Sequence, residues 1–187
     1  MLRYGKAVPQ NKSTYTATLG DVYKYITSDS AKFATETLRQ KLSSGMSKQE
    51  ASEFKLLNFP TATFSGVFSY RNKEHLIKES PLLVLDFDHI DTPSELQTLQ
   101  KSLLSDAYFP TRLLFVSPSG QGLKWVIRID DWCGCSRTDY FNSLSNYIYA
   151  THGVKPDSSG KDITRLCFLC HDKNAIITNI SNNDETH

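Results

Sequence analysis

The chain has little net charge, because its 21 lysines and arginines are matched by 20 aspartates and glutamates for a formal charge of +1. This balance excludes a protein that binds nucleic acid through overall charge alone, so any phosphate binding must be local. The chain also lacks a run of about 18 apolar residues, and its beginning lacks the apolar stretch of a secretory signal. We therefore expect a cytoplasmic protein with no membrane contact.

Cysteine is scarce, and its spacing does not resemble a secreted disulfide framework. Cys133 and Cys135 are one residue apart, and Cys167 and Cys170 flank a Phe-Leu pair. This pattern indicates a reducing compartment. Four thiolates, with His171 nearby, are an alternative structural zinc site, although residues three apart on a strand point to opposite faces.

The hydrophobic pattern predicts a helical first third and a strand-rich remainder. Apolar residues recur at helical spacing from Thr18 to Lys55, and Ser47 and Glu50 are spaced as a capping box. After Pro60, short apolar runs predict buried strands, and two stretches of helical spacing interrupt them. The expected strands are residues 64–70, 81–88, 111–117 and 123–129 with a final strand pair at 163–170 and 174–179, and the expected helices are residues 92–106 and 137–151.

These elements predict one globular domain with a central sheet, of α/β or α+β class. Residues 1–60 form a helical lead-in packed on the core, residues 61–180 form the core itself, and residues 181–187 form a disordered tail. The sequence pattern alone leaves open whether the strands run parallel or antiparallel.

The most informative segment is Leu82-Leu-Val-Leu-Asp86-Phe-Asp88. Its apolar residues predict a buried strand, and because residues two apart share a strand face, Asp86 and Asp88 point to the same side. Two like charges at the edge of a core are costly unless they are neutralised, and paired carboxylates suit Mg²⁺ or Mn²⁺. The alternative is a helix cap and a surface acid without metal. The segment indicates metal and phosphate chemistry without fixing the reaction.

A glycine-bearing turn joins the next two expected strands. It contains Ser117, Ser119, Gly120, Gly122 and Lys124. Glycines let backbone amides approach a phosphate, the hydroxyls add donors, and the lysine adds a positive charge, so the turn resembles a phosphate cradle. It is not a Walker loop, since the Gly-Lys-Ser/Thr ending and the following helix are missing. A plain hairpin turn is the alternative.

A third segment, residues 154–172, has an acidic, glycine-containing turn before an expected strand. A two-metal phosphoryl-transfer site needs a further carboxylate, and Asp157 and Asp162 both qualify. Arg165 is placed to hold triphosphate oxygens in a bidentate manner. A solvated turn with a surface ion pair is the alternative.

Together the three segments resemble the motifs of the archaeo-eukaryotic primase (primase-polymerase) superfamily. The first motif is Asp86-Phe-Asp88, the second is Ser117 to Lys124, and the third is Asp157 with Arg165. The lead-in that ends in Lys55 to Pro60, followed by a Phe-Ser-Gly-x-Phe strand and Arg71, is similar to the primase-like domain at the amino end of VirE-type proteins of Bacteroides and their mobile elements. The resemblance covers residues 18–178.

The resemblance implies an α+β domain with a central, mostly antiparallel sheet and flanking helices, acting as a DNA primase or polymerase. Asp86, Asp88 and Asp157 would be catalytic and would hold two Mg²⁺ or Mn²⁺ ions. The nucleotide-binding set would be Ser117, Ser119, Gly120, Gly122, Lys124 and Arg165. The implied partners are nucleoside triphosphates, a single-stranded DNA template, and a helicase or ATPase domain or protein. Weaker candidates for template contact are Tyr70, Arg71, Trp125 and Arg128.

One departure from the superfamily leaves two alternatives open. Its second motif commonly carries a histidine where this chain has Lys124, and a lysine binds phosphate as a point charge but is no neutral donor at pH 7. The first alternative is therefore a weakened primase fold that acts as a DNA-binding or docking module. The second is a phosphatase of the haloacid-dehalogenase type, with Asp86 as nucleophile, Asp88 as acid/base and Asp130 and Asp131 as late acids.

Overall fold

The computed structural model describes residues 2–3 and 16–178, to which every structural statement below refers. The expected tail at residues 181–187 lies outside this range. The helices are α1 (Leu19–Thr27), α2 (Lys32–Ser43), α3 (Lys48–Asn58), α4 (Pro93–Leu104) and α5 (Arg137–His152), with 3-10 turns η1 (Asp29–Ala31), η2 (Lys73–His75) and η3 (Ser158–Lys161). The strands are β1 (Leu2–Arg3), β2 (Thr61–Ala62), β3 (Gly66–Phe68), β4 (Leu76–Glu79), β5 (Leu82–Phe87), β6 (Thr111–Val116), β7 (Leu123–Arg128), β8 (Cys167–Phe168) and β9 (Ile176–Ile177).

Helices α1, α3, α4 and α5 each begin at a residue whose side chain caps the first turn. The expected Ser47–Glu50 capping box is present at the start of α3, and Thr92 forms a second one with Glu95 ahead of Pro93 in α4. Each box satisfies backbone N–H groups that a helix start leaves without partners. Local sequence therefore sets where these helices start.

The central sheet has the strand order β5-β7-β6-β9, and all its neighbouring strands are antiparallel. This confirms the expected α+β class with a mostly antiparallel sheet. Strands β6 and β7 form a hairpin through residues 117–122, and β5 pairs with β7 so that Asp86 lies opposite Lys124. The first and second sequence motifs therefore meet on adjacent strands.

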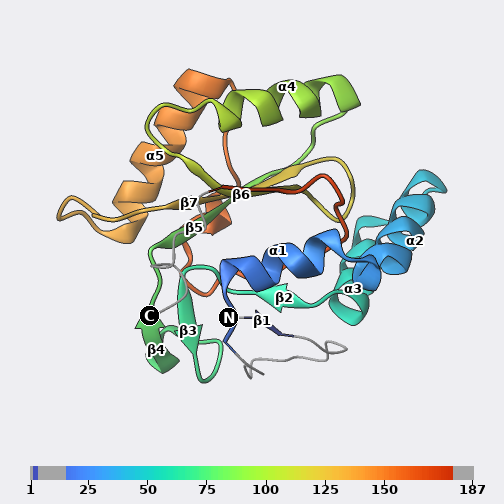
Figure 1. Cartoon of the computed structure of the whole chain (residues 1–187), viewed down its shortest axis with the longest axis horizontal. Helices are drawn as coiled ribbons and strands as arrows, with labels where there is room; N and C mark the ends of the chain where they lie inside the picture. The colour runs from blue at the N-terminus through green and yellow to red at the C-terminus, as the bar shows by residue number, and fades with distance from the viewer. Residues whose placement is uncertain (1, 4–15, 179–187) are drawn as a thin grey trace.

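Helices cover both faces of this sheet (Figure 1). Helices α4 and α5 pack on one face against Leu85, Trp125 and their neighbours. Helices α1 to α3 lie on the other side, where a second buried cluster includes Val84 and Val126. Because side chains alternate along a strand, Asp86 and Lys124 share the face of Val84 and Val126. The helical lead-in thus shares a core with the face that carries these two charged residues.

The final strand pair expected at residues 163–170 and 174–179 is wrong. Strand β8 pairs with β2 in the small sheet β1-β2-β8, whereas β9 pairs with β6 at the edge of the central sheet. The two segments separate because the intervening Asp172 ties the chain to two places: its backbone N–H donates to the Ile26 carbonyl of α1 and its carboxylate accepts from the Val116 N–H of β6. Strand β3 was expected but its hairpin partner β4 was not, since β4 is a short strand with three of its four residues exposed.

A buried polar cluster connects α4 to α5. His152 Nε2 lies 2.8 Å from Asp106 Oδ2, Tyr147 donates to the same oxygen at 2.9 Å, and His152 Nδ1 lies 2.7 Å from Ser102 Oγ. The Asp106 side chain is 0% exposed. Burial opposes its ionisation, but hydrogen bonds from the Phe109 amide and His152 outweigh this and lower the Asp106 pKa. The cluster fixes the two helices against each other.

None of the helices in the described part of the chain combines the length and apolar character needed to span a membrane.

Candidate functional site

The three motif segments converge on one cleft of about 430 Å³ at the end of β5 and the start of β7. Both acids of the first motif, both serines and Lys124 of the second, and Arg165 of the third line it. The lining residues are Ser52, Lys55, Leu56, Arg71, Asp86, Asp88, Ser117, Pro118, Ser119, Lys124, Ser159, Asp162, Arg165, Leu166 and Phe168. Segments far apart in sequence therefore form one polar site.

An ion-paired group occupies the floor of this cleft. Asp86 Oδ2 accepts from Lys124 Nζ and lies 3.3 Å from Arg165 Nη2. Asp86 is 7% exposed and Lys124 8%. A buried charge needs a partner of opposite sign, so β5 and β7 supply the pair directly through their register.

The two cleft lysines experience different environments. Burial opposes the charge of Lys124, but the neighbouring Cys167, Asp86 and Asp88 raise its pKa above the ordinary value. The pKa of half-buried Lys55 is lowered, mainly by burial and then by repulsion from Lys124. Lys55 at the end of α3 was not among the expected site residues, and only its position ahead of the Pro60 turn marked it in the sequence.

The turn of residues 117–122 is a tightly closed hairpin loop. Ser117 N–H donates to the Gly122 carbonyl at 2.8 Å, and Gly120 N–H donates to the Ser117 carbonyl at 2.9 Å. A Cβ atom on Gly122 would lie 2.2 Å from the Phe87 carbonyl, so only glycine fits there. Gly120 has φ of +82°. Neither glycine lines the cleft, and the Gly120 amide already has a partner within the turn. The turn therefore contributes Ser117, Pro118 and Ser119 to the cleft lining, and the two serines are its hydroxyl donors.

The structure separates the roles of the two candidate third acids. The Asp157 N–H donates to the Asp86 carbonyl at 2.7 Å, and Asp157 Oδ2 lies 3.6 Å from Arg165 Nη2. Partial burial opposes ionisation of Asp157, but the Ser159 amide and hydroxyl, and then Arg165, lower its pKa. Asp162 lines the cleft, but its carboxylate accepts from the Thr164 amide and hydroxyl. Asp157 is thus the acid tied to β5.

The fit of the acids to Mg²⁺ or Mn²⁺ rests on Asp86 Oδ1, a buried oxygen with no hydrogen-bond partner in the described part of the chain. Such an oxygen is costly unless a cation or water reaches it. Over residues 2–3 and 16–178, no three His, Cys, Asp or Glu side chains form a group that could hold a metal. Mg²⁺ usually needs only one or two carboxylates, with waters and substrate phosphates completing its shell. Asp86 and Asp88 therefore fit a cation whose remaining ligands come from water or from another molecule.

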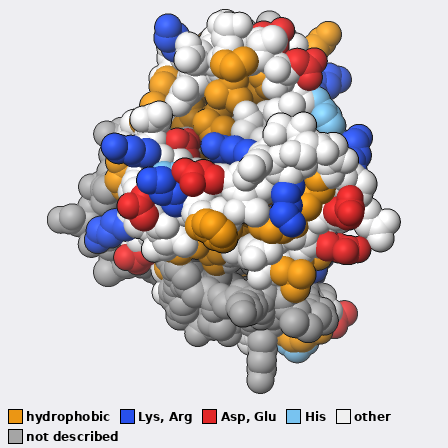
Figure 2. All heavy atoms as spheres, turned by 90° about the vertical axis from the view of Figure 1, so that its right-hand side faces the viewer, with side chains coloured by type: hydrophobic (Ala, Val, Ile, Leu, Met, Phe, Trp, Pro, Cys, Tyr) orange, Lys and Arg blue, Asp and Glu red, His pale blue; other side chains and the backbone are white. Residues whose placement is uncertain are grey.

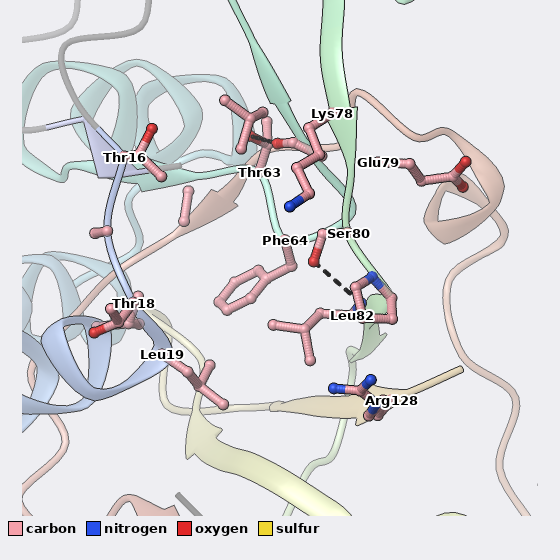
Figure 3. Close-up of a pocket in the computed structure, with 16 residues that line it drawn as sticks. Thr16, Thr18, Leu19, Thr63, Phe64, Lys78, Glu79, Ser80, Leu82 and Arg128 are labelled. Carbon is pink, nitrogen blue, oxygen red and sulfur yellow. Dashed lines mark hydrogen bonds between the residues drawn. The ribbon is translucent and has the colours of Figure 1, made fainter. Parts of the chain in front are cut away.

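Two of the weaker template candidates lie elsewhere. Trp125 is 0% exposed and donates to Thr111 Oγ1 within the core, so its expected template contact is wrong. Its place on the alternating strand β7 points it to the α4–α5 face. Arg128 lies at the far end of β7, beside a smaller hollow of about 160 Å³ in which Phe64 and Leu82 lie side by side (Figure 3). Arg71 does line the main cleft, and Tyr70 is 43% exposed beside it in sequence.

The four cysteines lie in two different environments. Cys133 and Cys135 are exposed, whereas Cys167 and Cys170 are buried, and burial raises the pKa of both buried thiols to about 12. A thiol with a high pKa resists becoming the thiolate that zinc needs. The buried pair belongs to the core on the α1–α3 face of the sheet. These environments do not favour a zinc site shared by all four.

Acidic and basic side chains intermingle on the side of the molecule where α2 lies (Figure 2). No broad basic area is visible on this face. In the cleft itself, the four cations Lys55, Arg71, Lys124 and Arg165 lie among three acids, Asp86, Asp88 and Asp162. The cleft therefore holds four cations and three acids, an excess of one positive charge.

Comparison with known proteins identifies the family. Residues 55–176 match the model of the BT4734-like N-terminal domain, so the chain belongs to this family. Among solved structures it is similar to the polymerase domain of Mycobacterium tuberculosis Ligase D in complex with DNA, with 14% identity and a TM-score of 0.35. That match covers 64% of this chain and about half (49%) of the other. A search of curated proteins gave no match.

Proposed function

We propose that the chain is a metal-dependent nucleotidyltransferase of the primase-polymerase type, which binds a nucleoside triphosphate and a single-stranded DNA template. The observation that carries this proposal is the cleft itself, which holds six of the nine expected site residues among its lining residues. Its size suits a small ligand, and its mixture of carboxylates, hydroxyls and cations suits a triphosphate with its cation.

The phosphates would bind to the cationic side of the cleft. Lys55 and Arg71 line it without an ion pair in the described part of the chain, and Arg165 is one-third exposed and ready to contact a ligand. Lys55 is half-buried beside Lys124, and an anion in the cleft would relieve the repulsion between these two ammonium groups. Ser117 and Ser119, which also line the cleft, would add hydroxyl donors.

Asp86 and Asp88 would hold Mg²⁺ or Mn²⁺, with Asp157 behind them through its contact with Arg165. When bound, the ion lowers the pKa of an attacking 3′-hydroxyl and neutralises charge on the phosphates. The chain's own residues would orient the triphosphate. The positive charges of Arg165 and Lys124, which lie beside Asp86 at the floor of the cleft, would attract its phosphates. Leu56, Leu166 and Phe168 form the apolar wall that a base could contact.

The test is nucleotide incorporation on a single-stranded DNA template with Mn²⁺. Asp88→Asn is the decisive variant, because Asp88 is exposed at the strand end and its replacement leaves the buried pair of Asp86 and Lys124 intact. We expect incorporation to fall by at least about 100-fold, as for loss of a metal ligand. The matched control is Asp91→Asn, an exposed acid outside the cleft, which should retain wild-type activity. Equal activity of Asp88→Asn and the control would refute the proposed site.

The second candidate function is a DNA-binding or docking module without catalysis. It is favoured by the pairing of Lys124 and Arg165 with Asp86, which leaves that carboxylate neutralised without a metal. This candidate predicts binding of nucleotide or DNA that is independent of Mn²⁺, with no incorporation.

The phosphatase alternative does not fit the geometry. Arg128 lies opposite Leu82, at the end of β7 remote from Lys124 and Asp86. Asp130 and Asp131 follow Arg128, so about six residues of extended chain, roughly 20 Å, separate them from the cleft. They therefore lie too far away to act with Asp86 on one phosphate.

A further inference from the structure

Arg39 of α2 reaches across to the serine turn. Its Nη2 donates to the Ser117 carbonyl at 3.2 Å and its Nε to the Pro118 carbonyl at 3.3 Å. Both residues line the cleft. A planar guanidinium that contacts two successive carbonyls fixes the direction of the turn as well as its position, which a single lysine amine cannot do.

The turn is built to receive this guanidinium. A Cβ atom on Gly120 would lie 3.2 Å from Arg39 Nε, tight enough that the Arg39 side chain would have to shift by a few tenths of an ångström, so glycine leaves room for it. The Ser117 carbonyl accepts from Gly120 N–H and from Arg39 together. Ser117 Oγ lies 3.1 Å from Ser119 Oγ, so the position of this backbone also sets where the two hydroxyls meet.

A second connection supports the same turn. Cys170 Sγ donates to the Val116 carbonyl at 3.1 Å, and the Val116 N–H donates to Asp172 at 2.7 Å. The segment that carries Cys170 and Asp172 is itself held by α2, because the His171 N–H donates to Thr35 Oγ1 at 2.9 Å. The helical lead-in thus holds the end of β6 both directly and through the C-terminal segment.

We propose that Arg39 is a positioning residue that holds the turn of residues 117–122 so that Ser117 and Ser119 face a phosphate in the cleft. The functional part of this inference rests on the proposed nucleotide site. Arg39 lies outside residues 55–176, the part of the chain that matches the family model. The helical lead-in therefore completes the site instead of only covering the core.

The experiment compares Arg39→Ala, Arg39→Lys and the control Gln40→Ala in the full chain. Gln40 is the exposed neighbour on the same helix. Amide hydrogen exchange of a peptide that spans the turn measures its stability, and titration with ATP and Mn²⁺ measures nucleotide affinity. We expect exchange of the Ser117 and Gly120 amides to rise by about tenfold or more in Arg39→Ala, because two charge-assisted hydrogen bonds are lost.

Nucleotide affinity should fall by about fivefold to tenfold in Arg39→Ala and recover in part in Arg39→Lys, which restores one donor. If the Ser117 and Gly120 amides exchange at the wild-type rate in Arg39→Ala, Arg39 does not hold the turn and the proposal is wrong. If exchange is faster in Arg39→Ala but the affinity for ATP is unchanged, Arg39 holds the turn without positioning the serines for a phosphate. If the wild type binds no nucleotide, the proposed function fails, and the exchange data alone still decide whether Arg39 holds the turn.

Discussion

The replacement Asp86→Asn separates the proposed role of Asp86 as metal ligand from its observed role as counter-ion of Lys124 and Arg165. The carboxylate lies between Lys124, which is 8% exposed, and Arg165, whose side chain is 34% exposed. Removing its charge leaves a buried ammonium without its partner, and breaking a buried pair costs about 3–5 kcal/mol. We take the lower end, about 3 kcal/mol, because asparagine still accepts a hydrogen bond and Arg165 retains Asp157.

For a domain of this size, about 3 kcal/mol corresponds to a fall in Tm of roughly 6–12 °C, measured by thermal unfolding. The matched control is Asp88→Asn, the same chemical change two residues away at an exposed position, where the Tm should change little. The double replacement Asp86→Asn/Lys124→Met removes both charges and should be more stable than Asp86→Asn, since no unpaired buried charge remains.

The same variant changes nucleotide binding in opposite directions with and without metal. Asp86→Asn removes the anionic partner of Lys124 and one of the two anionic partners of Arg165, so binding of ATP without metal should strengthen. If Asp86 also holds the ion, the gain in affinity on adding Mn²⁺ should shrink by about tenfold or more. Calorimetric titration with and without Mn²⁺ measures both. A wild-type Tm in Asp86→Asn would refute the reasoning for the buried pair of Asp86 and Lys124. An unchanged gain in affinity on adding Mn²⁺ would refute the role of Asp86 as a metal ligand.

Three further predictions concern the fold around the site. Asp106→Asn should lower the free energy of unfolding by about 2 kcal/mol at pH 7, because it weakens a buried carboxylate network. Because the pKa of Asp106 is lowered in the fold, its carboxylate contributes fully to the free energy of unfolding above its ordinary pKa of about 3.9, and this contribution is lost as pH falls through the folded pKa. Denaturant titrations should therefore show the free energies of unfolding of variant and wild type converging in acid. Gly122→Ala should cost about 3 kcal/mol, because its Cβ would meet a carbonyl at 2.2 Å, whereas Gly20→Ala, with its nearest contact at 3.6 Å, should not destabilise α1; equal Tm values for the two variants would contradict this. A thiol reagent should modify Cys133 and Cys135 in the native protein and the two buried cysteines only on unfolding; four equally fast thiols would show that the described burial is wrong.

Much of the scaffold was predictable from local sequence. The capping residues Ser47 and Thr92, and the apolar run ahead of Asp86, act over a few residues, and they specify their helices and strand without tertiary information. The final strand pair failed for the opposite reason. Its two segments are each compatible with β structure, but their partners β2 and β6 are distant in sequence, and pairing between distant segments depends on register and packing.

The candidate site was predictable in its acids, its serines and the cations Lys124 and Arg165, but not in the cations that the helices α2 and α3 supply. Asp86 and Asp88 follow a recognisable strand, whereas Lys55 and Arg39 lie on helices whose sequence shows no phosphate-binding motif. Their relevance appears only when α2 and α3 are placed against the end of β6 and β7. A residue such as Arg39 lies in a segment whose sequence shows only the periodicity of a helix that packs on the core. A single sequence therefore assigns the whole segment to packing and gives no sign of its contact with the site.

A chain with a net charge of only +1 can still bind an anion in this cleft, because four cations line it. Two of its four cations, Lys124 and Arg165, are already paired with Asp86, while Lys55 and Arg71 line the same space from other elements. Binding of an anion therefore needs no net positive surface, because the local field comes from cations that converge on one volume. It also follows that the cleft could contact few phosphates of a DNA strand at once, so DNA binding through the cleft would be weak and only shallowly dependent on salt. If the proposed function holds, a template would be held mainly by contacts outside the cleft, and the cleft would favour the compact charge of a triphosphate.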